Sequence, residues 1–241
     1  MDLVAGVSLP GKGQIRNPWH IRALAAAVEK EHGRLVPCSG LESVVMSGSR
    51  LIGLKTRHGR IGCEQAVIAA GAWTGPILAG FGVSLATPPV KGQIVLLNAG
   101  QRAPERMIEH GTRYLVPRQD GRVLVGSTEE HVGFDMRSTR EAVQALKEEA
   151  FRLCPALLSC EVEAAWAGPR PGSMDALPYL GPVQGHEGLF VAAGHFRAGL
   201  QLSTGTALMM AALMRGETPI LDPRPFALER EPVHAAPLFR S

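Results

Sequence analysis

Apolar residues change their spacing several times along the chain, and each change marks an expected element. Between positions 17 and 33 they recur every three or four residues, which is the period of an amphipathic helix. Asn17 can cap this helix, Pro18 suits its first turn and Gly33 can end it. We therefore predict an amphipathic helix that starts at Asn17 and stops at Gly33.

Residues 34–70 contain short apolar runs separated by turn sequences, which predicts a β-meander. The turns are Ser47-Gly48-Ser49 and His58-Gly59, and the runs occupy positions 35–36, 44–45, 51–54 and 67–69. The last run leads into a short expected helix at positions 76–80.

From Pro88 to residue 165 the pattern predicts an antiparallel sheet with one helix. Strands are expected at positions 93–97, 113–117, 122–126 and 162–167, and the turn Gln119-Asp120-Gly121 marks a hairpin. Ser138 and Glu141 have the spacing of a capping box, and Pro155 ends the helix that they open. The apolar stripe of that helix consists of Val143, Leu146, Ala150 and Leu153.

The stretch from 188 to 216 organises the end of the chain. It predicts a buried strand at 189–193, a glycine-bracketed turn at 194–199 and an apolar helix at 200–214, with Gly216 as a left-handed cap. A glycine turn that feeds a helix presents free backbone N–H groups and the positive end of the helix dipole. This arrangement suits a bound negative charge, although an ordinary strand-to-helix turn fits the same residues. The proline-rich residues after Pro219 are expected to form an extended or loose arm.

Composition limits the classes of protein that fit. The chain has 241 residues, 45% of them hydrophobic and 20% charged, with a net charge of +3. No charged run indicates a nucleic-acid or membrane partner, and no apolar run approaches the roughly 18 residues that span a membrane. No secretory signal or GxGxxG fingerprint is evident. Since the cysteines at positions 38, 63, 154 and 160 form no CxxC pair, we expect free thiols and a cytoplasmic location.

Four motifs resemble those of the FAD-dependent D-amino-acid oxidase superfamily, especially the glycine oxidases. Residues 194–200 (GHFRAGL) are similar to its flavin-contacting turn, and residues 166–173 (WAGPRPGS) to its substrate-arginine motif. Residues 67–74 (VIAAGAWT) resemble its second dinucleotide-domain motif, and residues 113–118 (RYLVPR) its tyrosine-bearing strand. The motifs follow the family's order, so the resemblance covers most of the chain.

The resemblance implies an α/β fold of mixed α+β type. It combines the C-terminal part of a glutathione-reductase-like FAD-binding domain with an antiparallel-sheet substrate domain. Residues 1–87 are expected to be a partial FAD-binding domain, 88–165 the substrate domain, 166–218 a return to the FAD-binding domain and 219–241 an extended tail. The family's phosphate-binding loop should precede Met1, so the chain is expected to be a C-terminal portion.

The resemblance also implies roles for individual residues. Arg170 aligns with the arginine that binds the substrate carboxylate, Tyr114 with a tyrosine that closes the substrate pocket, and Arg197 with an arginine near flavin and substrate. From the residues alone, Arg170 could be a surface-loop arginine, Tyr114 a core tyrosine, and His195 is expected to be structural. The implied FAD-contacting residues are Leu41, Gly71, Ala72, Trp73, Gly194, His195, Phe196, Arg197, Ala198, Gly199 and Leu200.

The implied activity is oxidation of the amine of a small amino acid, such as glycine, sarcosine or a D-amino acid. FAD takes a hydride, the resulting imine is hydrolysed to a keto acid and ammonia, and dioxygen becomes hydrogen peroxide. Thiamine biosynthesis is the implied context, and a missing N-terminal half or a second copy could be a partner. Ala198 departs from the asparagine common in glycine oxidases, and Thr112 and Glu129 alter the polarity of the pocket.

Two other interpretations remain open at this level. One is a truncated, non-catalytic or partner-dependent fragment that does not bind FAD alone, because the phosphate-binding fingerprint is missing. The other is a related amine dehydrogenase of the sarcosine or proline type. No metal is expected, since His195 has no ligand partners at suitable spacing.

Overall fold

The chain divides into two compact units, Met1–Cys38 and Ser39–Ser241. The computed structural model describes residues 5–232 of these units. The chain contains both helices and strands, and the strands form three separate sheets. This content confirms the predicted mixed α/β class. The four domain ranges expected from the resemblance stay a prediction.

The first unit contains the predicted amphipathic helix as α1 (Asn17–Lys30). The predicted Asn17 cap is wrong, because Arg16 occupies the cap position and no side chain bonds the first turn. After the helix, the N–H of Gly33 bonds the carbonyl of Val28 at 2.8 Å, which turns the chain away. No residue of α1 is buried, so its apolar stripe is exposed.

The predicted meander is only partly correct. Strands β1 (Leu41–Ser47), β2 (Arg50–Thr56) and β3 (Gly59–Ile61) form an antiparallel sheet in that order, but residues 35–36 form no strand. The last run, β4 (Ala66–Ile68), leaves this sheet and pairs parallel with β11 (Leu189–Ala193). A parallel partner lies far away in sequence, so local spacing could not identify it.

The sheet of β4 and β11 is completed by β10 (Tyr179–Pro182), which pairs antiparallel with β11. After β4 the chain enters the 3₁₀ turn η1 (Gly71–Trp73) and the predicted short helix, α2 (Thr74–Ala79). These elements pack around the buried residues Leu51, Leu78 and Leu189. This core therefore joins segments from both ends of the second unit.

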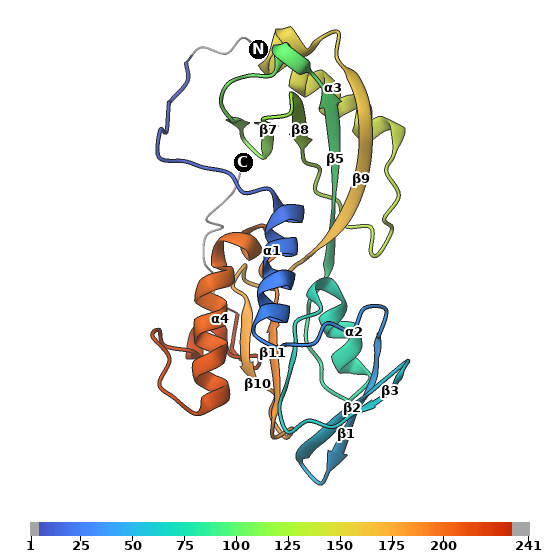
Figure 1. Cartoon of the computed structure of the whole chain (residues 1–241), viewed down its shortest axis with the longest axis vertical. Coiled ribbons are helices and arrows are strands. Elements are labelled where there is room, and N and C mark those ends of the chain that lie inside the picture. The colour runs from blue at the N-terminus through green and yellow to red at the C-terminus, as the bar shows by residue number, and fades with distance from the viewer. Residues whose placement is uncertain (1–4, 233–241) are drawn as a thin grey trace. The chain divides into compact units, whose positions relative to one another are not determined.

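The third sheet is antiparallel, with the order β6-β7-β8-β5-β9 (Figure 1). Its strands are β5 (Pro89–Asn98), β6 (Ile108–His110), β7 (Arg113–Pro117), β8 (Arg122–Gly126) and β9 (Glu161–Pro171). The predicted hairpin of β7 and β8 is confirmed. β5 and β9 pair over their whole length and are longer than predicted, because both contain glycine and proline, which are depleted in strands.

Arg170 lies on β9, so the alternative of a surface-loop arginine is wrong. β9 is at the edge of the sheet, where proline is tolerated because one side of the strand needs no ladder donor. Pro169 and Pro171 are paired in register with Lys91 and Pro89. The two prolines therefore flank Arg170 on a regular strand.

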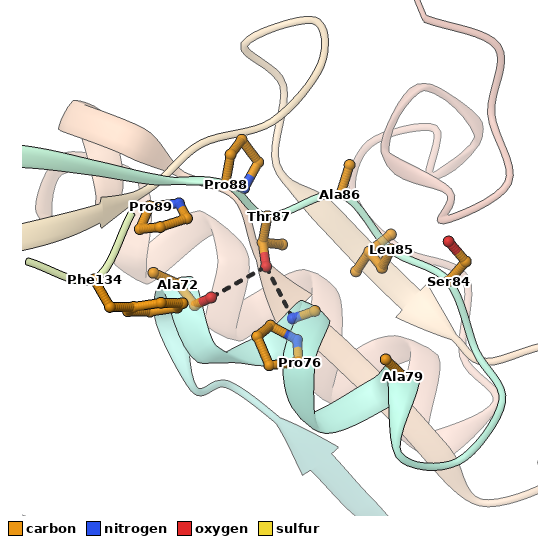
Figure 2. A pocket seen from close by; sticks show the side chains of 11 residues that line it. Ala72, Pro76, Ala79, Ser84, Leu85, Ala86, Thr87, Pro88, Pro89 and Phe134 are labelled. Carbon is orange, nitrogen blue, oxygen red and sulfur yellow. Dashed lines mark hydrogen bonds between the residues drawn. The ribbon is translucent and has the colours of Figure 1, made fainter. Parts of the chain in front are cut away.

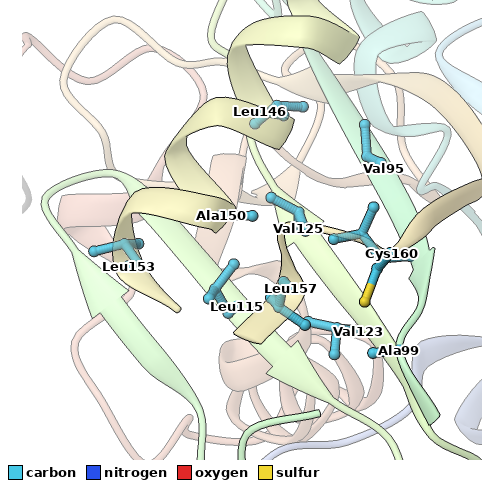
Figure 3. Packing of buried hydrophobic residues seen from close by; sticks show 11 residues of the cluster. Val95, Ala99, Leu115, Val123, Val125, Leu146, Ala150, Leu153, Leu157 and Cys160 are labelled. Carbon is cyan, nitrogen blue, oxygen red and sulfur yellow. The ribbon is translucent and has the colours of Figure 1, made fainter. Parts of the chain in front are cut away.

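Helix α3 (Arg140–Leu153) covers one face of this sheet, and its buried residues belong to the stripe predicted from the sequence. Thr139 caps it by accepting a hydrogen bond from the N–H of Ala142, so the predicted cap at Ser138 is wrong by one residue. The 3₁₀ turns η2 (Gly100–Arg102) and η3 (Pro155–Leu157) flank the same core. The core cluster, shown in Figure 3, consists of Val95, Leu97, Ala99, Leu115, Val123, Val125, Leu146, Ala150, Leu153, Leu157 and Cys160.

The C-terminal strand, turn and helix are confirmed. Strand β11 leads through the 3₁₀ turn η4 (Phe196–Ala198) into α4 (Gly199–Arg215), and Gly216 ends the helix with φ 69°. Only a residue that tolerates the left-handed region closes a helix in this way, which explains the glycine.

The expected loose arm is wrong for the described part of the tail. The 3₁₀ turn η5 (Arg224–Phe226) lies there, and Arg230 pairs with Asp175 at 2.7 Å. Both of these side chains are buried, so the pair ties the tail to the loop between β9 and β10. Residues 233–241 of the predicted tail lie outside the described residues.

Within residues 5–232, none of the helices has the length and apolar character needed to cross a membrane. The same residues contain no group of three or more His, Cys, Asp or Glu side chains that could hold a metal ion. None of the four cysteines, all of which lie within the described residues, forms a disulfide bond.

Candidate substrate and cofactor site

Tyr114 and Arg170 lie on the same face of the five-stranded sheet. In register, Tyr114 is opposite Gly126, Gly126 is opposite Ile94, and Ile94 is opposite Trp166. Directly opposed residues project from one face, and that face recurs at every second residue of a strand. An even number of positions separates Trp166 from Arg170, so Arg170 belongs to the face of Tyr114.

Two glycines give these side chains room to lie flat on the sheet. A Cβ on Gly126 would lie 2.2 Å from Cζ of Tyr114, and a Cβ on Gly92 would lie 2.2 Å from Nη2 of Arg170. Real Cβ atoms do not approach other atoms so closely. The positions of the phenol ring and of the guanidinium therefore depend on glycine beneath each of them.

The Arg170 guanidinium is half-buried and held by neighbouring acceptors. Nη1 donates to the carbonyl of Thr128 at 3.1 Å, and Nη2 donates to Oγ of Ser127 at 2.7 Å. Burial and the positive charge of Arg197 lower its pKa, while Tyr114 and Glu129 act in the opposite direction. Each terminal nitrogen carries two hydrogens, so one N–H on each remains for a ligand.

Arg197 and Glu129 complete a group that we call the arginine cluster: Arg170, Arg197, Glu129 and Tyr114. Nη2 of Arg197 donates to Oε2 of Glu129 at 2.6 Å. Two guanidinium groups and one carboxylate leave one net positive charge. The arginine cluster can therefore take one monoanionic ligand, and a planar carboxylate matches the geometry of a guanidinium.

Gly92→Ala should displace Arg170 without removing its charge. We expect affinity for a small carboxylate such as glycolate to fall about tenfold, because the guanidinium must leave its acceptors. The thermal unfolding midpoint should change little, since the clash involves the end of a flexible side chain. Glycolate binding and unfolding can both be measured by calorimetry.

Gly168→Ala is the matched control for this substitution. Gly168 lies opposite Gly92 in register, and nothing lies within 4 Å of a Cβ built there. Equal glycolate affinities for the two variants would contradict the role assigned to Gly92.

The turn before α4 has the features of a site for an electron-rich ligand. Gly194 has φ 78°, and a Cβ there would lie 2.9 Å from Cδ2 of Tyr179, so only glycine fits. No side chain caps α4, and its first turn contains no acidic residue. The first N–H groups of this helix are therefore without a side-chain acceptor, and the helix dipole adds positive potential.

A buried hydroxyl lies beside the same turn. Oγ of Ser173 is buried and has no hydrogen-bond partner among the described residues. Its Cβ would lie 3.3 Å from a Cβ on Gly194. An unpartnered buried hydroxyl is costly unless a ligand satisfies it. Ser173, Gly194 and the start of α4 therefore fit the polar edge of a flavin ring, whereas the sequence offers no GxGxxG cradle for the FAD diphosphate.

Strand β9 connects this turn to the other predicted flavin segment. It contacts both η1, which contains Gly71, Ala72 and Trp73, and η4, which contains Phe196 and Arg197. The substrate-binding prediction and both cofactor-binding predictions therefore meet along one strand. Their individual roles stay predictions.

Other predicted cofactor residues lie in separate surroundings. Leu41 begins β1 and packs against the core around Leu51. The Trp73 ring stacks on Phe134 with 5.4 Å between ring centroids. Gly199 and Leu200 begin α4 next to Ala198, which occupies its cap position.

His195 is bonded within the fold, as expected for a structural residue. Its Nε2 lies 2.8 Å from Oγ1 of Thr206 on α4. Burial lowers the pKa of its imidazole below the ordinary value of 6.5. The neutral ring is therefore favoured in the folded chain.

This shift predicts how stability depends on pH. Below pH 6.5 the unfolded chain binds more protons at His195 than the folded chain does. The free energy of unfolding should therefore fall as the pH is lowered from 7.5 to 5.5. Urea unfolding across this range should give a shallower slope of unfolding free energy against pH for His195→Gln than for the wild type. Equal slopes for wild type and His195→Gln would contradict the prediction.

An open hollow of about 420 Å³ lies next to η1 and α2 (Figure 2). Thr87 closes one side of it, because its Oγ1 accepts from the N–H of Gly75 at 2.9 Å and donates to the carbonyl of Ala72. Its lining contains no titratable side chain and no member of the arginine cluster. The hollow therefore offers no charged group for a carboxylate, although Ala72, one of the predicted FAD-contacting residues, lines it.

Sequence reasoning missed Ser127 and Thr128, which accept hydrogen bonds from Arg170, and the buried network beside them that includes Glu130. Lys91 and Gln93 were a usable signal, because they are polar residues in an otherwise apolar strand. Both are almost completely buried. Their role becomes clear only from their contacts across the sheet.

Comparison with known proteins agrees with this geometry. The chain matches the FAD dependent oxidoreductase family (DAO) over residues 2–213. The glycine oxidase of Pseudomonas putida is 38% identical over 230 residues, covering 92% of this chain and 61% of that protein. The hydrogen cyanide synthase subunit HcnC of Pseudomonas aeruginosa is 34% identical over 217 residues, covering 89% of this chain and 52% of that protein.

A solved structure supports the same relationship. The crystal structure of glycine oxidase from Geobacillus kaustophilus matches with a TM-score of 0.86 at 36% identity, covering 92% of this chain and 60% of that one. The fold and the sequence thus define a flavin-dependent class of oxidoreductase. The chain belongs to the FAD-dependent oxidoreductase family that includes the glycine oxidases, which confirms the resemblance. It spans about 60% of the length of these two glycine oxidases.

Proposed function

We propose that the chain carries the carboxylate-binding site of an oxidase that acts on the amine of a small amino acid. The observation that carries this proposal is the way in which neighbouring residues hold the guanidinium of Arg170. Its guanidinium lies on Gly92, two of its N–H groups are held by Ser127 and Thr128, and two others remain for a ligand. Such a rigid fork is suited to a carboxylate.

The residues of the arginine cluster have distinct tasks in this proposal. Arg170 binds the substrate carboxylate, and the Tyr114 hydroxyl donates to the same group. Glu129 holds Arg197 by the 2.6 Å ion pair, so that Arg197 adds positive potential without competing for position. An amine that enters neutral needs no general base, which agrees with a group that contains no histidine.

FAD is the cofactor in this proposal, held at its flavin end by Ser173, Gly194 and the N-terminus of α4. When bound, FAD supplies the two-electron oxidation of the amine to an imine. For glycine or a D-amino acid, the overall reaction consumes the amino acid, dioxygen and water, and yields a 2-oxo acid, ammonia and hydrogen peroxide. Sarcosine would yield glyoxylate, methylamine and hydrogen peroxide. Glycine, sarcosine and D-amino acids are the proposed substrates. A cytoplasmic location and a place in thiamine biosynthesis stay predictions.

A second candidate is a fragment that needs a partner before it binds FAD. The observation that favours it is the exposure of apolar side chains on one helix of each unit. No residue of α1 is buried, and Leu202 and Leu208 of α4 are exposed. A second polypeptide or a second copy of this chain could bury these apolar side chains.

The first experiment is an absorption spectrum of the purified chain after incubation with FAD and desalting. Retained flavin bands, followed by peroxide formation from glycine but not from methylamine, would support the oxidase, because methylamine lacks the carboxylate. Retained flavin with equal rates for both amines would contradict the role of Arg170. A colourless protein that forms no peroxide would favour the partner-dependent fragment.

A further inference from the structure

The segment that holds Arg170 is not a regular strand. β8 ends at Gly126, and beyond it the main chain bonds β5 at two positions. The N–H of Thr128 donates to the carbonyl of Gln93 at 3.3 Å, and the N–H of Lys91 donates to the carbonyl of Glu130 at 2.9 Å. Ser127 and Thr128, which accept the two hydrogen bonds of Arg170, belong to this segment. The geometry of the guanidinium therefore depends on what fixes this short segment.

A buried polar network fixes it through side chains of β5. Oγ1 of Thr128 accepts from the N–H of Gln93 at 2.9 Å and donates to Oε1 of Glu130. Nε2 of Gln93 donates to the same Oε1 at 2.8 Å, and Nζ of Lys91 lies 3.6 Å from Oε2. The network continues to α3, where the N–H of Thr139 donates to Oε1 of Gln93 at 2.8 Å.

The burial of this network is its unusual property. The side chain of Lys91 is 2% exposed, and that of Glu130 is 27% exposed. Burial alone raises the pKa of Glu130, but hydrogen bonds from Thr128 and Gln93 and the charge of Lys91 outweigh this effect and lower it. A buried ion pair is seldom a net source of stability compared with apolar side chains of the same volume. Its value here is the fixed placement of the groups bonded to it.

We propose that Glu130 is a positioning residue for substrate binding, which acts on Arg170 through Thr128. This inference rests on the function proposed for Arg170. Within residues 5–232, no hydrogen bond or ion pair joins Glu130 directly to Arg170. It anchors the hydroxyl of Thr128, the main chain of Thr128 presents its carbonyl to Arg170, and Lys91 supplies the charge that keeps Glu130 in place. Without Glu130, the acceptors on Ser127 and Thr128 can move, and the guanidinium of Arg170 is no longer held over Gly92.

The test is a double-mutant cycle of Glu130→Gln and Arg170→Lys on the full chain, loaded with FAD if the flavin is retained. The probe is glycolate, which has a carboxylate but no amine, and its dissociation constant is measured by calorimetry. Glu130→Gln should raise that constant about tenfold when Arg170 is present, which corresponds to the loss of one or two hydrogen bonds. It should change the constant less than about twofold in the Arg170→Lys background, because residues that act in series are not additive.

Thermal unfolding midpoints of the same variants separate positioning from stability. The effect of Glu130→Gln on glycolate affinity should depend on whether Arg170 is present. A general loss of stability would lower the unfolding midpoint without producing this dependence. Glu163→Gln is the control, because Glu163 forms an ion pair with Arg122 elsewhere on the same sheet, at 2.7 Å. It should leave the glycolate constant unchanged.

Thr128→Val provides a second test if Glu130→Gln does not fold. It removes the hydroxyl that joins the network but keeps the carbonyl that accepts from Arg170. A similar loss of glycolate affinity would support the proposal, and wild-type affinity would overturn it.

Failure of the inference can be told apart from failure of the proposed function. If Arg170→Lys weakens glycolate binding while Glu130→Gln and Thr128→Val do not, Glu130 has no positioning role and the carboxylate site stands. If Arg170→Lys has no effect on glycolate, the carboxylate site itself is wrong, and the inference falls with it.

Discussion

Arg170→Lys should raise KM for glycine by roughly 30- to 1000-fold in the flavin-loaded protein, the equivalent of about 2–4 kcal/mol of binding free energy. A lysine ammonium is a point charge that cannot make two parallel hydrogen bonds to a carboxylate. It also cannot bond Ser127 and Thr128 in the way that the guanidinium does. Steady-state peroxide formation measures the change. The effect on kcat should be smaller than that on KM, since the lost interaction already exists in the bound substrate.

The control for this prediction is Arg122→Lys. Arg122 lies on β8 of the same sheet, is solvent-exposed and pairs with Glu163 and Asp120. It should leave KM unchanged. If Arg170→Lys behaves like Arg122→Lys, the arginine that binds the carboxylate has been misassigned, and Arg197 becomes the next candidate.

Arg230→Met should lower the free energy of unfolding by about 3–5 kcal/mol, because it removes the guanidinium charge that neutralises the buried carboxylate of Asp175. Arg230 donates from Nε and Nη2 to the two oxygens of Asp175, at 2.8 and 2.7 Å, and also to the carbonyl of Leu177. Its guanidinium lies 4.2 Å from the ring centroid of Tyr179, a cation–π contact that methionine would lose. Urea unfolding monitored by circular dichroism measures the change.

Arg224→Met is the matched control, because Arg224 belongs to the same segment and forms an ion pair with Asp222 that is largely exposed. It should cause no measurable change in stability, as expected for surface pairs. Arg230→Met combined with Asp175→Asn should recover part of the loss, because the carboxylate charge is then absent. Equal stability of the Arg230→Met and Arg224→Met variants would mean that the tail is not anchored by Arg230.

The sequence correctly predicted the turns and helices that depend on residues close together in the chain. Turn chemistry at residues 119–121 predicted the β7–β8 hairpin, and Gly216 predicted the end of α4, because a positive φ is a property of one residue and its neighbours. The period of the apolar residues predicted α1 and α3. The capping residue of α3 was missed by one position, since Ser138 and Thr139 are chemically alike and only the folded backbone selects between them.

The motifs also predicted which residues would form the candidate site, although they lie far apart in the chain. Tyr114, Arg170 and Arg197 were identified by resemblance, and the arginine cluster brings them together. The support around them was not predicted. Gly92, Thr128 and Glu130 act through contacts across neighbouring strands. The spacing of residues within one strand does not indicate which other strand pairs with it.

The sequence by itself therefore determined the class of fold, most helices and turns, and the residues expected to bind substrate and flavin. Only the tertiary structure decided that β4 pairs with β11, that β9 carries Arg170 at a sheet edge, and that Arg230 ties the tail to Asp175. The physical reason is the range of the interactions. Helix periods, caps and turns depend on residues within a few positions of one another, whereas strand register, buried ion pairs and the seating of a guanidinium on glycine depend on segments that meet only when the chain has folded.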